Sequence, residues 1–136
     1  MKRLMKKIVI FLLVFCTCIP SLSIYASPPE IVPMYDHAQS CTTILNITSN
    51  GAAYCYGKVL IDYSYSAELT LTLYRSRNKE NMTYVTSWTS NSGSSISEEI
   101  FVFSGYYYRL YIEAKIYDSH NNLAETITEY STWEKY

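Results

Sequence analysis

From residue 67 onward, apolar and polar residues alternate along two stretches of the chain with a period of two. The stretch AELTLTLYR, residues 67–75, places its leucines on one face and Glu68, Thr70 and Thr72 on the other. The stretch YRLYIEAKI, residues 108–116, alternates in the same way. This period is typical of half-buried β-strands. The two segments are therefore predicted to be strands that share one core, made of Leu69, Leu71, Leu73, Leu110, Ile112 and Ile116.

Five further segments are rich in β-branched and aromatic residues, which favour strands. They are residues 41–48, 52–61, 83–89, 95–103 and 125–131. Clusters of Gly, Asn, Asp and Ser separate the segments and indicate turns. No segment past residue 40 has helical spacing over ten residues. Seven short strands in about 100 residues predict an all-β fold, an antiparallel sandwich of two sheets.

The start of the chain has the pattern of a secretory signal peptide. Four basic residues precede an apolar run from Ile8 to Ile19, and small residues follow as far as Ala26. Such a pattern predicts a leader over residues 1–26 that is removed on export. The apolar run is shorter than the about 20 residues of a membrane-spanning helix, so an uncleaved anchor is the less favoured alternative. We expect a secreted, extracellular protein with no membrane insertion after cleavage.

The remaining residues are predicted to form one domain behind a short spacer. Residues 27–39 hold three prolines and no sustained period, which indicates a flexible N-terminal segment. Residues 40–136 are the predicted sandwich domain. Without the four basic residues of the leader, seven Lys and Arg remain against twelve Asp and Glu, a formal charge of −5. This acidic balance argues against nucleic-acid binding, which needs clustered basic residues, and against adsorption to anionic lipid.

Cys41 and Cys55 are the cysteines beyond the leader, and we expect a disulfide between them because thiols of exported proteins tend to pair. The Asn50-Gly51 turn signal conflicts with this expectation. A two-residue hairpin turn there would place Cys55 opposite residue 46 and Cys41 opposite residue 60. At about 3.4 Å per residue, that separation exceeds the Cα limit of about 7 Å for a disulfide. The loop is then wider, the first strand is broken, or the thiols stay unpaired.

The stretch SGYYYRLYI, residues 104–112, resembles the tyrosine corner of immunoglobulin-like sandwiches in its fibronectin type III form. In that corner a tyrosine near the start of the sixth strand bonds through its hydroxyl to backbone a few residues upstream. Gly105 and Tyr108 match the glycine and the tyrosine of the motif. The resemblance implies an immunoglobulin-like fold and a buried Tyr108, but no function, because such sandwiches serve many unrelated roles.

A second, closer resemblance concerns the whole chain beyond the predicted leader, residues 27–136. The stretch SCTTILNITSNGAAYCYGKV, followed by TSW, SGYYYR and ETITEYS, is similar to small uncharacterised exported proteins of Gram-positive bacteria. These proteins have a similar spacing of the two cysteines and a Thr-Ile-Thr strand near the end. The resemblance implies an exported β-sandwich and carries over no activity.

Residues able to perform chemistry are scarce. His37 and His120 belong to no metal-binding or nucleophile motif. Glu98 and Glu99 are neighbours in a predicted strand, so their side chains point to opposite faces and cannot form a catalytic pair. We therefore expect no enzyme, no cofactor, no metal and no catalytic residue.

The chain has a surplus of aromatic residues, with fourteen tyrosines and two tryptophans beyond the leader. Alternation places Tyr106 and Tyr108 with the buried set and Tyr107, Arg109, Tyr111 and Tyr117 with the outward set. Outward tyrosines suit recognition, although rings can also simply cover a sheet. We expect a non-enzymatic binding module whose partner is an unknown protein or glycan. The alternatives are a secreted antimicrobial or signalling factor, or an enzyme with an unrecognised site.

Overall fold

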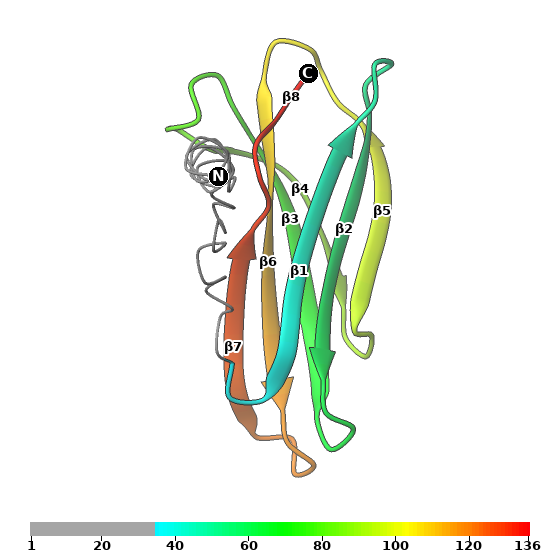
Figure 1. The fold of residues 1–136 in the computed structure, drawn as a ribbon, viewed down its shortest axis with the longest axis vertical. Helices are drawn as coiled ribbons and strands as arrows, with labels where there is room; N and C mark the ends of the chain where they lie inside the picture. Colours follow the sequence, from blue (N-terminus) through cyan, green and yellow to red (C-terminus); the bar gives the residue numbers. More distant parts are fainter. Residues whose placement is uncertain (1–34) are drawn as a thin grey trace, which may run out of the picture. The chain divides into compact units, whose positions relative to one another are not determined.

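The computed structural model describes residues 35–136, which form two antiparallel β-sheets and no helix (Figure 1). One sheet has the order β1-β2-β5 and the other the order β4-β3-β6-β7, with a short β8 pairing with β6. The strands are β1 (Ala38–Ile47), β2 (Ala52–Ile61), β3 (Ser66–Ser76), β4 (Thr83–Ser90), β5 (Ser95–Phe101), β6 (Tyr107–Tyr117), β7 (Leu123–Tyr130) and β8 (Glu134–Lys135). The predicted leader and residues 27–34 of the predicted spacer lie outside the described residues.

All seven predicted strands are confirmed, as is the all-β antiparallel class. The eighth strand was not predicted, because two residues carry no period and β8 is defined only by its pairing with β6. Strand β1 begins at Ala38, inside the segment predicted to be flexible. Just before it, the backbone N–H of His37 donates to the Glu125 carboxylate at 2.8 Å. This contact joins the entry to β1 to the strand β7.

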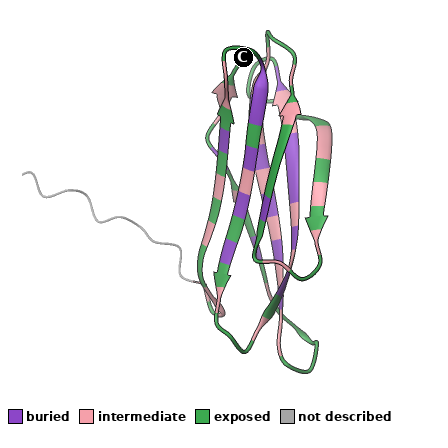
Figure 2. Cartoon of the chain, turned by 90° about the vertical axis from the view of Figure 1, so that its right-hand side faces the viewer, coloured by how far each residue is buried: buried purple, intermediate pink, exposed green. Residues whose placement is uncertain are grey.

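The core lies between the inner faces of the two sheets and is centred on β3 and β6. These strands pair so that Leu69, Leu71 and Leu73 lie opposite Ala114, Ile112 and Leu110. These six residues and Ile116 are fully buried, so the predicted core is confirmed. Burying each Leu or Ile side chain contributes about 1.5–3 kcal/mol. Figure 2 shows the consequence as buried positions that alternate along the central strands, while the outer positions stay partly or fully exposed.

The β1–β2 connection is one residue longer than the expected two-residue turn. Thr48 N–H donates to Ala52 O at 2.9 Å, and Gly51 N–H donates to Thr48 O at 3.0 Å. Gly51 has a φ of 87°, a left-handed conformation that glycine adopts without steric cost. Ser49, Asn50 and Gly51 therefore form a three-residue loop, in which a turn is followed by a left-handed residue.

The expected disulfide between Cys41 and Cys55 is wrong, and both cysteines are free thiols. The three-residue loop sets a register in which Cys41 lies opposite Val59 and Cys55 lies opposite Leu45. The two cysteines are thus four residue pairs apart, about 14 Å at about 3.4 Å per residue, twice the disulfide limit of about 7 Å. The continuous β1–β2 ladder holds the two thiols too far apart to pair, whatever the redox state of the surroundings.

Tyr108 occupies the corner that links β5 to β6. Its side chain is 1% exposed, and its hydroxyl donates to Phe103 O at 2.7 Å and accepts from Phe103 N–H at 3.1 Å. Gly105, in the connection, has a φ of 85°. Burial is the main cause that raises the pKa of the Tyr108 hydroxyl, which stays protonated at neutral pH and able to donate. The ring thereby fills the core while its polar end is satisfied by backbone.

We expect Cys41 and Cys55 to be free in unreduced protein and to react slowly with iodoacetamide at pH 8. Burial raises the pKa of each thiol to about 12 from an ordinary value of 9.0, helped by Glu129 beside Cys41 and Glu98 beside Cys55. Only about one thiol in ten thousand is then a thiolate at pH 8. Peptide mass spectrometry of native and urea-unfolded protein measures this difference. A peptide pair cross-linked through Cys41 and Cys55 would contradict the register.

The same raised pKa values predict a pH dependence of stability. The folded state holds the thiol protons more tightly than the unfolded chain, so their contribution is complete below pH 9 and is lost between about pH 9 and about pH 12. Cys55→Ala should flatten this decline of the free energy of unfolding, measured by urea titration across that window.

We expect Tyr108→Phe to lower the free energy of unfolding by about 1 to 2 kcal/mol, because both backbone groups of Phe103 lose their partner. Tyr107→Phe is the matched control, since the Tyr107 hydroxyl has no hydrogen-bond partner among residues 35–136. Urea unfolding measures both. Equal stability of the two variants would show that the hydroxyl of Tyr108 contributes nothing.

Candidate binding surface

The outer face of the β4-β3-β6-β7 sheet carries a group of neighbouring aromatic side chains. Strand β6 alternates strictly, so its buried residues face the core and Tyr107, Arg109 and Tyr111 face outward. Across the ladder, Tyr74 of β3 lies opposite Arg109, and Tyr84 of β4 lies opposite Tyr74. We call this group the aromatic surface, and it consists of Tyr74, Tyr84, Tyr107, Arg109, Tyr111, Tyr130 and Trp133.

Arg109 lies in the middle of the aromatic surface. Its Cζ atom is 4.4 Å from the ring centre of Tyr130 and 5.5 Å from that of Trp133. Its Nε donates to Ser131 O at 2.7 Å. Ser131 lies where β7 ends, and its hydroxyl accepts the N–H of Leu110 at 2.9 Å in place of a ladder carbonyl. Arg109 thus orients two rings, and its bond to Ser131 O holds the segment between β7 and β8 against β6.

Tyr111 and Tyr130 form a ring pair on adjacent strands. They are directly opposite in the β6–β7 register, and their ring centres are 4.8 Å apart. Partial burial, followed by the nearby Glu113 and Tyr130, raises the pKa of the Tyr111 hydroxyl. The Tyr111 hydroxyl therefore stays protonated at neutral pH. Tyr130 remains 40% exposed and Tyr84 58%, so partner molecules can reach the rings.

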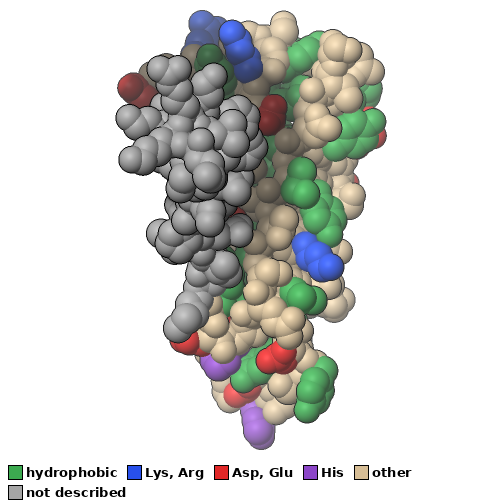
Figure 3. Space-filling view, in the orientation of Figure 1, with side chains coloured by type: hydrophobic (Ala, Val, Ile, Leu, Met, Phe, Trp, Pro, Cys, Tyr) green, Lys and Arg blue, Asp and Glu red, His purple; other side chains and the backbone are tan. Residues whose placement is uncertain are grey.

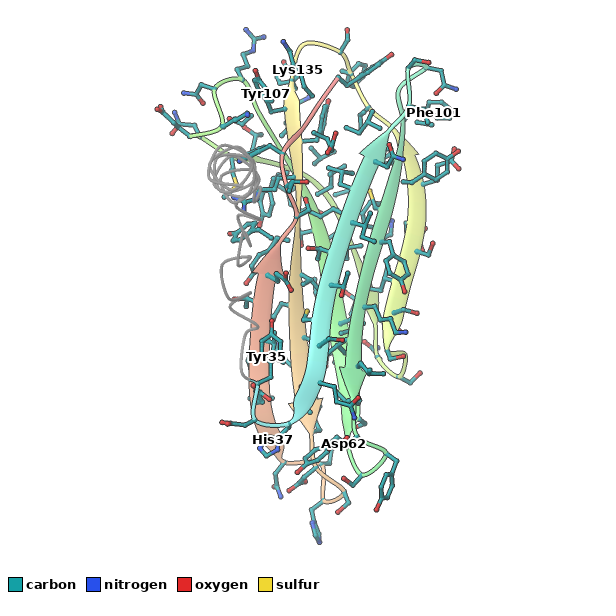
Figure 4. All side chains as sticks on the ribbon, in the orientation of Figure 1. Tyr35, His37, Asp62, Phe101, Tyr107 and Lys135 are labelled. Atoms are coloured by element: carbon teal, nitrogen blue, oxygen red, sulfur yellow. The ribbon has the colours of Figure 1, made fainter. Side chains whose placement is uncertain are left out.

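Lysines flank the end of the aromatic surface. Lys79 Nζ lies 4.6 Å from the ring centre of Tyr107 and Lys135 Nζ lies 5.6 Å from it. Figure 4 shows Tyr107 and Lys135 together at the end of the domain opposite His37 and Asp62. A cation over an aromatic ring contributes about 0.5–1 kcal/mol at exposed sites. These contacts restrict the motion of the Tyr107 ring.

Not every residue predicted for the binding face lies together. Tyr107, Arg109 and Tyr111 are successive outward positions of β6, whereas Tyr117 pairs with Ser66 at the far end of the strand. Between them the same face carries Glu113 and Lys115, which form an ion pair at 3.5 Å. Tyr117 is thus separated from the aromatic surface by a charged stretch.

Four members of the aromatic surface were missed at the sequence level, namely Tyr74, Tyr84, Tyr130 and Trp133. Alternation places Tyr74 opposite in parity to the buried leucines, so this signal was present. Which of the outward residues of different strands meet depends on strand order and register, which no local pattern contains. Trp133 lies in the break between β7 and β8, where no alternation applies.

The opposite sheet presents a different outer face. Tyr54 is 46% exposed and Phe101 is 69% exposed, on β2 and β5.

Tyr106, predicted to be buried, is partly exposed and packs at the border of the core. Within residues 35–136 no cluster of His, Cys, Asp and Glu is arranged to hold a metal ion. No helix in this part of the chain is long and apolar enough to cross a membrane.

Comparison with models of known protein families finds none that matches the chain, and comparison with curated proteins finds no similar sequence. The function of this protein is therefore inferred from the aromatic surface and the fold.

We expect Arg109→Lys to lower the free energy of unfolding by about 1 to 3 kcal/mol. Lysine keeps the charge but loses the planar stacking on both rings and the directed Nε bond to Ser131 O. Lys115→Gln, which breaks only an exposed ion pair, should change the stability by less than about 1 kcal/mol. Urea unfolding of the two variants measures this. An Arg109→Lys variant as stable as wild type would mean that the arginine does not hold the β7–β8 break.

Proposed function

We propose that this protein is an exported, non-enzymatic binding module that recognises its partner through the aromatic surface. The observation that carries the proposal is the composition of that surface, which is made of five tyrosines and one arginine on adjacent strands and of one tryptophan in the β7–β8 break. Tyr, Trp and Arg are the residues that dominate binding energy at protein interfaces, and Lys, Glu and Asp are depleted there.

The aromatic surface is also well ordered before a partner arrives. Its rings are held by cross-strand contacts and by Arg109, which is itself bonded to backbone. A tyrosine ring loses little conformational entropy on binding, because it has two rotatable side-chain bonds. Ordering rings in advance reduces this cost further. These properties favour recognition over a purely structural cover for the sheet.

A fibronectin type III-like identity for the sandwich is part of the proposal. In the constant-type immunoglobulin arrangement the fourth strand belongs to the sheet of the first, second and fifth strands. Here β4 instead pairs with β3, which leaves a three-stranded and a larger sheet. This order, together with Gly105 and the Tyr108 corner, supports the fibronectin type III form. Such domains commonly serve as rigid supports for binding surfaces.

Export is supported by the leader pattern in residues 1–26, with its basic start, its apolar run and its small residues before Ser27. An exported domain meets its partner outside the cell, so the partner is a protein or a glycan of that environment. The Tyr, Trp and Arg composition favours a protein, since aromatic and arginine side chains are enriched at protein interfaces. A glycan partner would use the same rings for stacking.

We expect the double variant Tyr111→Ser with Tyr130→Ser to bind its partner at least about tenfold more weakly, because it removes the central ring pair. Its free energy of unfolding should fall by only about 0.2–1 kcal/mol, which is the contribution of one cross-strand pair. The matched control is Tyr54→Ser with Tyr56→Ser, which removes two rings from the outer face of the opposite sheet.

The measurement compares wild type and both variants, immobilised, for retention of proteins from the producer's culture medium and for binding to a glycan array. A partner retained by wild type and by the control, and lost by the Tyr111 and Tyr130 variant, supports the proposal. The arm in which it is retained identifies it as protein or glycan. Equal retention by all three proteins, or loss only in the control, would contradict it.

A further inference from the structure

A pocket of about 460 Å³ lies where the β3–β4 connection meets the start of β6. Arg75 and Arg77 line it together with Tyr106 and Thr83. Arg75 pairs with buried Tyr108 across the ladder and so belongs to the inner side of the sheet, whereas Tyr107 belongs to the outer side. The pocket is therefore distinct from the aromatic surface and lies on the opposite face of the same sheet.

Two guanidinium groups of the pocket gather around one ring. Arg75 Cζ is 4.9 Å and Arg77 Cζ is 5.2 Å from the ring centre of Tyr106. Arg77 Nη2 also donates to the Tyr106 hydroxyl at 3.2 Å. That hydrogen bond, followed by the positive charge of Arg77, lowers the pKa of Tyr106. The lowered pKa of the Tyr106 hydroxyl reflects the local excess of positive charge in the pocket.

No carboxylate neutralises this charge within the described part of the chain. The one salt bridge there joins Lys115 to Glu113. Glu80, the acidic residue of the β3–β4 connection, accepts a hydrogen bond from Asn78 at 3.0 Å. The guanidinium group of Arg75 has no hydrogen-bond partner among residues 35–136, so its N–H donors are available to a ligand. Guanidinium groups match phosphate, sulfate and carboxylate in shape and charge.

The pocket is built on ordered backbone. Arg75 is held on both sides, opposite Tyr108 and opposite Thr83. The connection that follows is fixed by Asn78, whose Oδ1 accepts the N–H groups of Glu80 and Asn81 at 3.2 and 3.3 Å. The arginines therefore need little reorganisation to bind, which lowers the entropic cost.

The surrounding charge also favours an anion. Four of the seven Lys and Arg beyond the leader, Arg75, Arg77, Lys79 and Lys135, belong to the β3–β4 connection, its flank and β8, although the mature chain is acidic. On the face seen in Figure 3, Lys and Arg side chains gather at this end of the domain, another basic side chain lies about midway, and His side chains lie near the other end. A localised positive field raises the local concentration of anionic ligands.

The volume exceeds what one oxyanion fills and lies within the range of about 300–1,000 Å³ typical of small-molecule sites. Beside the arginines, the lining offers the Tyr106 ring for stacking and the side chains of Asn81 and Thr83 as hydrogen-bonding groups. These groups suit a ligand body that carries hydroxyls.

We propose that the pocket between Arg75, Arg77 and Tyr106 binds the phosphate or sulfate group of a small hydroxylated ligand of the sugar-ester class. Arg75 supplies unused donors to the oxyanion, and Arg77 adds charge while it remains bonded to the Tyr106 hydroxyl. The body of the ligand lies against the Tyr106 ring and the polar side chains of Asn81 and Thr83.

Isothermal titration calorimetry of the purified protein tests this with glucose 6-phosphate, glucose 6-sulfate, glucose and inorganic phosphate. At least one ester should bind about tenfold more tightly than glucose, since hydrogen bonds to a charged group are the strong ones. The ester should also bind more tightly than inorganic phosphate, which lacks the sugar body. Binding should weaken as the salt concentration rises. Equal binding of the ester and glucose would overturn the proposal, and so would equal binding of the ester and inorganic phosphate.

Arg75→Gln should weaken binding of the ester at least about tenfold, while Lys58→Gln, an identical charge change at an exposed position of β2, should leave it unchanged. In NMR titrations of wild type, the Nε–H signals of Arg75 and Arg77 should shift, and that of Arg109 should not. This second readout applies even where Arg75→Gln lowers the stability. An equal loss of ester affinity in Lys58→Gln, or equal shifts of all three arginine signals, would mean that the ester responds only to the overall charge of the protein. Either result would contradict a specific site.

Discussion

The antiparallel pairing of β3 with β6 joins eleven residue pairs in one unbroken register, and the apolar side chains on its inner face are fully buried. Because side chains of a strand alternate between faces, burial of Leu110 and Ile112 commits Arg109 and Tyr111 to the outer face. A shift of one residue would exchange the two sets, exposing leucines and burying an arginine. The large cost of that exchange makes the register of this pair the constraint that positions the other elements.

The run of tyrosines at the start of β6 divides into three roles because of that register. Tyr108 turns inward and closes the corner through Phe103, Tyr107 turns outward between two lysines, and Tyr106, before the strand, borders the pocket of Arg75 and Arg77. Three identical side chains thus meet three environments: buried backbone, exposed ammonium groups and paired guanidinium groups. The chemistry of each ring follows from its position.

Cation–π contacts recur at this end of the domain. Arg75, Arg77, Lys79, Arg109 and Lys135 each lie over an aromatic ring. Carboxylate partners would have cancelled these charges, whereas rings orient them and leave most of their hydrogen-bonding groups available. An acidic domain thereby keeps a basic end, which favours the anionic ligand proposed for the pocket of Arg75 and Arg77.

Alternation with a period of two is a local property, so the residue pattern alone was enough to predict the strands and their faces. Leu69, Leu71 and Leu73 indicate β3, and Leu110 and Ile112 indicate β6. The pattern also indicated the inward Tyr108 and the outward Tyr107, Arg109 and Tyr111. Which residues of different strands meet depends on strand order and register, and these are known only from the folded structure. The register set by the loop at Gly51 leaves the cysteines four residue pairs apart, and the order β4-β3-β6-β7 brings Tyr74, Tyr84 and Tyr130 beside Arg109. Contacts between strands distant in sequence depend on the summed burial of both sheets, which no single segment encodes.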